Sequence, residues 1–244
     1  MIENKRPKIN TKTNPAEPQK IVNKHLGHRA RLRAKFRKSA AALLDYEILE
    51  LFLFHLIPYK DTKLIAKELL DTFKSFEGVA LAEPCNLCKI RGVGASTALA
   101  LNILGEIFVR KARQHLQNAN LLNSWEAVIE YCQVHDGLRG TENVHVLFLN
   151  KRFHLIADEV LFSGTVDETP IYLREILKRA LELNASSIIV VHNHPSGNTT
   201  PSRADIEQTQ KLSYAAKAVG ITLQDHIIIS PQTYTSLRAM GTID

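Results

Sequence analysis

The sequence contains no apolar run of the length that a membrane-spanning helix needs. Uninterrupted apolar stretches such as Ile188–Val191 and Ala98–Leu101 are far shorter than the roughly 20 residues that cross a bilayer. The N-terminus is rich in lysine and lacks the apolar segment of a secretory signal peptide. We therefore expect a soluble, cytoplasmic protein with no membrane partner.

Cysteine is scarce, with three residues in a chain of 244, which is typical of a reducing compartment. Cys85 and Cys88 have the spacing of half a zinc site, but no second pair follows to complete it. We expect both to fill half-buried positions beside a helical hairpin, and Cys132 to fill a place in the core. The apolar content of 45% is ample for one large domain or two ordinary ones.

Negative charge is nearly absent from the front of the chain. Residues 1–38 contain twelve Lys or Arg and two Glu, a net charge of +10 in a chain whose total is +6. Residues 1–24 have few apolar side chains, which predicts a disordered basic arm. From His25 onward the basic and small residues are compatible with a helix. Such a segment can bind DNA phosphates through counterion release, and a solubilising tail with no defined partner is the alternative.

Residues 25–117 have the pattern of a small all-α domain. Asp61-Thr62 is expected to cap one of its helices, with Ile65, Leu69 and Leu70 on one face. An earlier helix is indicated by apolar residues at helical spacing, namely Leu43, Leu44, Ile48, Leu51 and Phe52.

The segment Ile90–Leu101 resembles the turn of a helix-hairpin-helix. Gly92 and Gly94 let the backbone bend tightly and present amide N–H groups at a helix start, where a DNA phosphate can bind. Hairpins of this type that bind DNA carry Lys or Arg after the second glycine, whereas this chain has Ala, Ser and Thr there. Lys89 and Arg91 flank the turn and can compensate. These four residues are the candidate nucleic-acid contacts, and a purely packed helical hairpin is the alternative.

Residues 123–244 alternate between strand and helix patterns, which indicates an α/β domain with helices packed on a central sheet. The expected strands are residues 144–149, 153–162, 187–193 and 221–229. The expected helices are residues 171–183 and 202–218, together with a helix that opens the domain at Ser124 and a helical turn near Thr233–Ala239.

Two histidines follow the apolar, β-branched run Ile188–Val191, which predicts a buried strand. Positions i and i+2 of a strand face the same way, so His192 and His194 point together. Ser202 is a candidate N-cap of the following helix, whose first turn can return Asp205 toward the two imidazoles.

Two imidazole nitrogens and one carboxylate oxygen are three protein ligands for Zn²⁺, which leaves the fourth position open as in catalytic zinc sites. Each feature also has an ordinary interpretation. Ser202 and Asp205 fit a simple capping pair, and a His-x-His pair also occurs on surfaces and in cores. Their combination at the end of a buried strand predicts a site for one zinc ion per chain.

The run His192-x-His194-Pro195 followed by Ser202-x-x-Asp205 resembles the JAMM motif of the MPN metalloprotease fold, and its fuller form His-Asn-His-Pro-Ser-Gly resembles the bacterial RadC family. The resemblance covers most of residues 25–244. It implies an α/β JAMM/MPN catalytic domain with cytidine-deaminase-like layering, preceded by a small all-α domain. Further stretches that agree with it are Glu142 ahead of Val146–Asn150, Leu161–Thr165, Arg174–Ile176 and Asp225–Ile228.

The resemblance also implies roles for individual residues. His192, His194 and Asp205 hold the zinc, and Ser202 hydrogen-bonds the oxyanion of a tetrahedral intermediate. An upstream glutamate acts as general base, and Glu142 is the candidate because it precedes an expected strand.

Glu142 has alternatives as well. A solvated charge at a strand edge is one interpretation of this residue, and Glu159, Glu168 and Glu175 are rival bases. Asp225-His226 is expected to be a buried hydrogen-bonded pair or a support for the ligands, because the ligand set is complete without it.

We interpret the chain as a RadC-like, zinc-dependent hydrolase, a metallopeptidase or isopeptidase that acts on a protein or peptide. The alternative is a DNA-associated repair or recombination protein whose metal domain is a nuclease or is structural. A third interpretation is an interaction scaffold with an inactive metal-bound fold.

Overall fold

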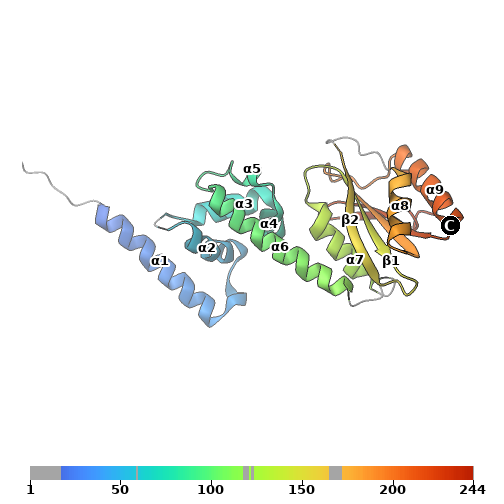
Figure 1. Ribbon diagram of the computed structural model, residues 1–244. Coiled ribbons are helices and arrows are strands. Elements are labelled where there is room, and N and C mark those ends of the chain that lie inside the picture. The colour runs from blue at the N-terminus through green and yellow to red at the C-terminus, as the bar shows by residue number, and fades with distance from the viewer. Residues whose placement is uncertain (1–17, 59, 118–120, 122–123, 165–171, 244) are drawn as a thin grey trace, which may run out of the picture. The chain divides into compact units, whose positions relative to one another are not determined.

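The computed structural model describes residues 18–58, 60–117, 121, 124–164 and 172–243. The chain forms two compact units, residues 1–68 and residues 69–244, and each is described by itself (Figure 1). In the part of the chain that the structure describes, no helix combines the length and the apolar character needed to cross a membrane.

The first unit is helical. It contains α1 (Pro18–Lys38), the 3-10 turn η1 (Ala40–Ala42), α2 (Asp45–Leu56) and the start of α3 (Lys63–Phe73). α1 begins at Pro18, inside the segment 1–24 for which the composition predicts a disordered arm. Proline suits the first turn of a helix, and the Gln and Lys that follow are good helix formers. Residues 1–17 lie outside the described residues.

Arg29 ties α1 to the end of α2. Its guanidinium donates hydrogen bonds to the carbonyl oxygens of Ile57 at 2.9 Å and Lys60 at 2.8 Å, and it lies 4.6 Å from the ring centre of Phe54. Carbonyls at the end of a helix lack partners within the helix, and a cation suits them. Part of the positive charge of α1 therefore serves the fold itself.

α2 begins after two of the residues that the helical spacing assigns to it. Leu43 and Leu44 precede the helix, because the backbone N–H of Leu44 donates to the Glu47 carboxylate at 2.9 Å and so caps it. The predicted cap of the next helix is confirmed, since Oδ1 of Asp61 accepts a hydrogen bond from the backbone of Lys63 at 3.0 Å.

Three helices open the second unit: α4 (Phe76–Leu81), α5 (Pro84–Leu87) and α6 (Ala95–Gln117). Gly92 turns the chain from α5 into α6 with a φ of +100°, which glycine adopts without strain. Cys85 and Cys88 are exposed, so the expectation that they fill half-buried positions is wrong. α5 is a single turn that buries Leu87, and its cysteines face away from that contact.

The second half of α6 belongs to the core of the second unit. Ala112 and Leu116 pack with Val128 and Cys132 of α7 (Trp125–Cys132), and Cys132 is buried as expected. The two compact units therefore do not coincide with the predicted domains 25–117 and 123–244, because α6 carries apolar side chains that need the core beside the sheet.

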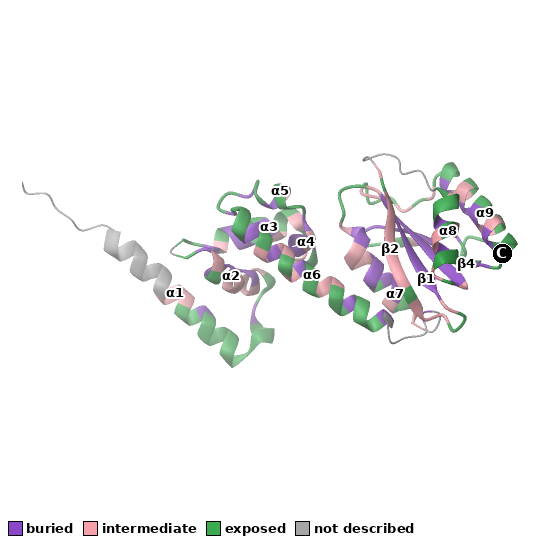
Figure 2. Ribbon diagram, in the orientation of Figure 1, coloured by how far each residue is buried: buried purple, intermediate pink, exposed green. Residues whose placement is uncertain are grey.

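A five-stranded sheet of order β2-β1-β3-β4-β5 forms the centre of this unit. Its strands are β1 (Asn143–Leu149), β2 (Leu155–Ser163), β3 (Ser187–Asn193), β4 (Thr222–Ile229) and β5 (Tyr234–Ser236). β1 is antiparallel to β2 and β3, β4 is parallel to β3, and β5 is antiparallel to β4. The predicted mixed α/β fold is confirmed, and Figure 2 shows β1 buried along its length.

Helices cover both faces of the sheet, and the alternation along each strand divides the core in two. On one face, α8 (Leu173–Glu182) and α9 (Arg203–Ala218) contribute to a core that includes Val144 and Val146 of β1. On the other face, α7 and the end of α6 pack with Leu147 and Leu149.

The C-terminal segment forms a strand in the first part of the range where the sequence predicted a helical turn. Residues 234–236 pair with β4 as β5, and the turn expected near Thr233–Ala239 follows the strand, where the backbone N–H of Met240 donates to the carbonyl oxygen of Ser236 at 3.2 Å. Asp225 of β4 holds the segment, because its carboxylate accepts hydrogen bonds from Oγ of Ser236 at 2.5 Å and from the backbone of Arg238 at 3.0 Å. For residues 234–236, pairing with β4 therefore outweighs the local helical pattern.

The close packing of α6 against α4 at Gly105 can be tested by substitution. A Cβ at this position of α6 would lie 2.5 Å from the carbonyl oxygen of Ala80 in α4, so the backbone must shift. Gly105→Ala is expected to lower the free energy of unfolding by about 1–3 kcal/mol, although alanine has the better helix propensity. Chemical denaturation of the full chain measures the change. Gly140→Ala, which adds its Cβ in open space, is the control and should stay within about 0.5 kcal/mol of wild type.

Candidate metal centre

β3 carries two histidines at its end. His192 is in register with Val144 of β1 and Ile228 of β4, so it has a strand on each side, and its side chain is 5% exposed. His194 follows the strand, and its backbone N–H still donates to the carbonyl oxygen of Ile229 at 3.0 Å. The two rings lie edge to face with centroids 4.9 Å apart, as the i, i+2 spacing predicts.

The loop after β3 orients the second imidazole. Nδ1 of His194 lies 2.7 Å from the carbonyl oxygen of Asn198, and Gly197 makes the turn between them with a φ of +83°. A carbonyl only accepts hydrogen bonds, so Nδ1 carries the proton and Nε2 keeps its lone pair. Histidines that bind metals are commonly fixed in this way.

Ser202 and Asp205 cap α9 reciprocally, as predicted. Oγ of Ser202 accepts a hydrogen bond from the backbone of Asp205 at 3.1 Å, and Oδ2 of Asp205 accepts one from the backbone of Ser202 at 2.8 Å. Because the serine oxygen acts as acceptor in this contact, its hydroxyl proton can still be donated.

The same cap places Asp205 beside both imidazoles. Its Oδ1 lies 3.4 Å from Nδ1 of His192, and its Oδ2 lies 4.0 Å from Nε2 of His194. Burial acts to raise the pKa of Asp205, but the nearby imidazole of His192 and the hydrogen bonds from Ser202 outweigh burial and hold the pKa well below its usual range. The carboxylate is therefore ionised, as a metal ligand must be.

Glu142 approaches His192 from the start of β1. Its Oε2 lies 3.5 Å from Nε2 of His192, and its side chain is 13% exposed. Glu142, His192 and His194 each offer a donor atom, and these atoms lie within 4.8 Å of one another. Asp205 contacts both histidines but is not a member of this group, so the distances leave open which carboxylate is the third ligand.

The environment of His192 fits a metal ion. Both of its ring nitrogens are buried without a hydrogen-bond partner, and an unpaired buried polar atom is costly. A cation bound by one of these nitrogens removes that cost for the nitrogen that binds it. Two imidazoles with a carboxylate are a donor set that Zn²⁺ favours, so these residues suit a zinc ion.

The rival glutamates have other surroundings. Both carboxylate oxygens of Glu159 accept hydrogen bonds from Arg179, at 2.6 to 3.1 Å, and this contact lowers the pKa of Glu159. Glu175 is exposed in the first turn of α8, and Glu168 lies outside the described residues. Of the candidate bases that the structure describes, Glu142 is the one that lies beside His192.

His226 of β4 supports the site from one side. Its ring is nearly parallel to that of His192, with centroids 6.2 Å apart, and its Nδ1 lies 2.6 Å from Oγ1 of Thr209, which donates to the carbonyl oxygen of Asp205. Burial and the nearby His192 lower the pKa of His226 to about 3, so the ring is neutral. The Asp225 carboxylate accepts a hydrogen bond from the backbone N–H of His226 and not from its ring. Its other hydrogen bonds hold the C-terminal segment.

The candidate nucleic-acid contacts lie together in the turn that precedes α6. Gly92 adopts its left-handed conformation there, and the carbonyl oxygen of Gly94 accepts a hydrogen bond from Ala98 at 2.9 Å, which begins the helix. Arg91 is exposed, whereas the Lys89 ammonium donates to an asparagine of α5 at 2.7 Å. Of the two glycines, only Gly92 has a positive φ.

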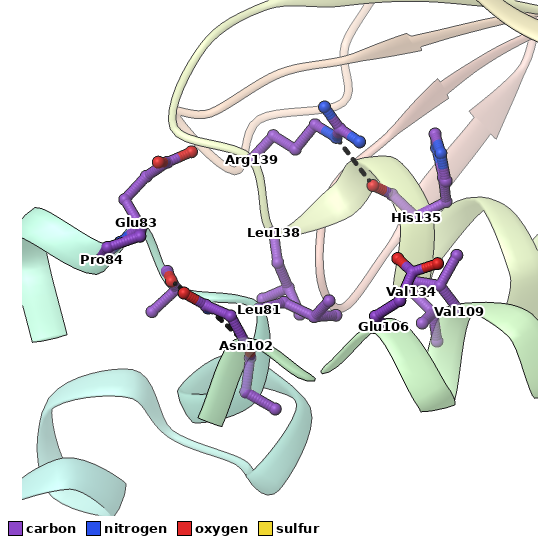
Figure 3. A pocket seen from close by; sticks show the side chains of 12 residues that line it. Leu81, Glu83, Pro84, Asn102, Glu106, Val109, Val134, His135, Leu138 and Arg139 are labelled. Atoms are coloured by element: carbon purple, nitrogen blue, oxygen red, sulfur yellow. Dashed lines mark hydrogen bonds between the residues drawn. The ribbon is translucent and has the colours of Figure 1, made fainter. Parts of the chain in front are cut away.

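A second group of donor atoms, which the sequence pattern did not predict, comes from His135, Asp136 and His145. His135 also lines a cavity of about 280 Å³ beside α6, together with Val134, Leu138 and residues of the α4–α5 segment (Figure 3). A histidine inside the apolar strand β1 was the signal that the sequence contained.

Comparison with protein families agrees with the geometry. Residues 122–242 match the family model described as RadC-like JAB domain. The match spans α7 to β5, and it includes Glu142, His192, His194, Ser202 and Asp205. The resemblance stated from the sequence is confirmed for this part of the chain: residues 122–242 form a RadC-like JAB domain.

Proposed function

We propose that this protein is a JAMM-type, zinc-dependent hydrolase that cleaves a peptide or isopeptide bond. The observation that carries the proposal is the convergence of Glu142, His192 and His194 within 4.8 Å, with Asp205 at 3.4 Å from His192. A zinc ion held there would polarise a scissile carbonyl and make a water molecule acidic enough to attack it.

His192, His194 and Asp205 are the proposed ligands. Asp205 is preferred to Glu142 because the helix cap fixes its position and because its low pKa keeps it ionised. The three residues lie on β3, just after β3 and in the first turn of α9, so each is anchored by backbone hydrogen bonds. Anchored ligands lose little conformational entropy when they bind an ion.

Glu142 is the proposed general base. Its Oε2 lies 3.5 Å from Nε2 of His192, and it belongs with both histidines to the group of donor atoms that lie within 4.8 Å of one another. From this position it can take a proton from the attacking water and deliver it to the leaving amine. Its side chain is 13% exposed, so it stays in reach of both solvent and substrate.

Ser202 is proposed to stabilise the oxyanion that develops on the attacked carbonyl. Its Oγ is held by the backbone N–H of Asp205 at 3.1 Å, which fixes the hydroxyl before substrate arrives. A preorganised donor of this kind costs little reorganisation in the transition state.

Metal content tests the ligand set. His192→Ala and Asp205→Ala are each expected to hold about one zinc ion fewer per chain than wild type, because a catalytic zinc site with two protein ligands left binds weakly. Elemental analysis of the purified full chains measures the difference. Full zinc content in both variants, with the fold intact by circular dichroism, would remove the basis of the proposal.

A second test separates the base from the ligands. Glu142→Gln is expected to keep its zinc and to lose hydrolysis of a peptide library by roughly two orders of magnitude or more. Glu159→Gln and Glu175→Gln are matched controls that should retain activity. If Glu142→Gln loses zinc, this residue is a ligand; if it hydrolyses at the wild-type rate, the base is another residue.

DNA binding by the helical region is a second candidate function. It is favoured by the left-handed turn at Gly92 and by the exposed basic side chains of α1, which include Arg31, Arg37 and Lys38. In this case the protein would act in repair or recombination, and its metal domain would be a nuclease or a structural element.

The salt dependence of DNA affinity tests this candidate. The triple variant Arg31→Gln, Arg37→Gln, Lys38→Gln leaves Arg29 in place and should flatten the plot of log affinity against log salt by about 0.9 for each DNA phosphate that it no longer neutralises. Three exposed lysines of the second unit, Lys178, Lys211 and Lys217, give a control of equal charge that should keep the slope. Absence of DNA binding by wild type at low ionic strength would exclude this function.

A further inference from the structure

A second cluster of metal-binding side chains lies on the opposite face of the sheet. β1 pairs Val144 with His192 and His145 with Val191, and neighbouring residues of a strand point to opposite faces. His145 therefore faces α7, away from the JAMM residues. α7 continues there into the π-helix η3 (Gln133–Gly137), which supplies His135 and Asp136. π-helical turns occur frequently at functional sites.

The donor atoms of this cluster are already in contact. Oδ1 of Asp136 lies 2.8 Å from Nδ1 of His135, and Oδ2 lies 2.7 Å from Nδ1 of His145. The two rings are 4.5 Å apart at their centroids. The side chains of Asp136 and His145 are each 1% exposed, and that of His135 is 17% exposed. Two imidazoles and a carboxylate converge here without any side chain having to move far.

The charges of the cluster favour a cation. Each oxygen of the Asp136 carboxylate lies within hydrogen-bond distance of one imidazole, Oδ1 near that of His135 and Oδ2 near that of His145. Asp158, 4% exposed in its side chain, adds a second carboxylate 3.9 Å from Nε2 of His145. Arg113 pairs with Asp158 and offsets one of the two negative charges. The remaining negative charge is balanced either by an extra proton on an imidazole or by a bound cation.

Asp158 also completes the surroundings that a histidine ligand needs. A ligating imidazole commonly donates its second N–H to a carboxylate. When Nδ1 of His145 binds an ion, its ring proton moves to Nε2, and Asp158 is the acceptor beside it. Asp158 is itself held in place, because the Tyr131 hydroxyl donates to its Oδ2.

An ion can reach the cluster from solvent. A cavity of about 630 Å³ is lined by Tyr131, His135 and Asp158, together with Arg113 of α6. His135 also lines the cavity that Figure 3 shows. A site with three protein ligands and an open side toward a cavity can bind a further small ligand on the ion.

We propose that His135, Asp136 and His145 form a second site for a divalent transition-metal ion of the Zn²⁺ type, independent of the JAMM residues. A plain structural network that ties η3 to β1 is the competing explanation. A metal site and a structural network differ in two measurable ways. A metal site binds a fixed number of ions per chain, and its binding depends on His135, the most exposed of the three residues.

The test uses the full chain as the double variant His192→Ala, Asp205→Ala, in which two of the three proposed JAMM ligands are removed. After treatment with a chelator, it is titrated with Co²⁺, whose visible absorption reports nitrogen and oxygen ligands. We expect about one equivalent to bind per chain, with Zn²⁺ displacing it. Adding His135→Ala should weaken Co²⁺ binding by at least about tenfold, and adding His154→Ala, a histidine outside the cluster, should leave it unchanged.

Three outcomes would overturn the proposal: no Co²⁺ uptake by the double variant, uptake that His135→Ala does not weaken, or uptake that His154→Ala weakens equally. Asp136→Asn adds a variant of nearly the same size in case loss of a histidine disturbs the fold, and circular dichroism checks each protein. The result is distinguishable from failure of the proposed hydrolase, because two of its three proposed ligands, His192 and Asp205, are absent from every protein in the titration.

Discussion

The antiparallel pairing of β1 with β3 is the constraint on which the rest of the site depends. It aligns Val144 with His192 and so brings the start of one strand, where Glu142 lies, beside the end of the other, where the histidines lie. Both strands are buried along their whole length, and a slip by one residue would turn every side chain to the wrong face. The core therefore enforces the register, and the register sets the distance between the carboxylate and the imidazole.

Helix α9 contributes to the site through its first turn. The hydrogen bonds that begin the helix, between Ser202 and Asp205, are the same ones that fix both side chains near the imidazoles. A capping pair and a metal site are thus compatible uses of the same two residues, since each carboxylate oxygen and the serine hydroxyl has capacity beyond the cap. Thr209, one turn later, continues this link from Asp205 to His226.

The alternation along β1 gives the two faces of the sheet different chemistry. Val144 and Val146 face the core under α8 and α9, whereas His145 faces α7 and meets Asp136. The second cluster depends on residues from α6, α7, η3, β1 and β2, including Arg113 and Asp158. Packing of α6 and α7 against the sheet creates it, which explains why the second unit extends forward to include α6.

The sequence by itself determined strands β1 to β4, the cap of α9 and the pairing of His192 with His194, because these follow from periodicity and spacing over a few residues. It did not determine the C-terminal strand, since residues 234–236 are ordered by a sheet edge and by Asp225. Nor did it indicate that His135 and His145 meet, or that Glu142 lies beside His192 while Glu159 pairs with Arg179. Those outcomes depend on which distant residues the fold places in contact, and only the tertiary structure, through strand register and helix packing, decides such contacts.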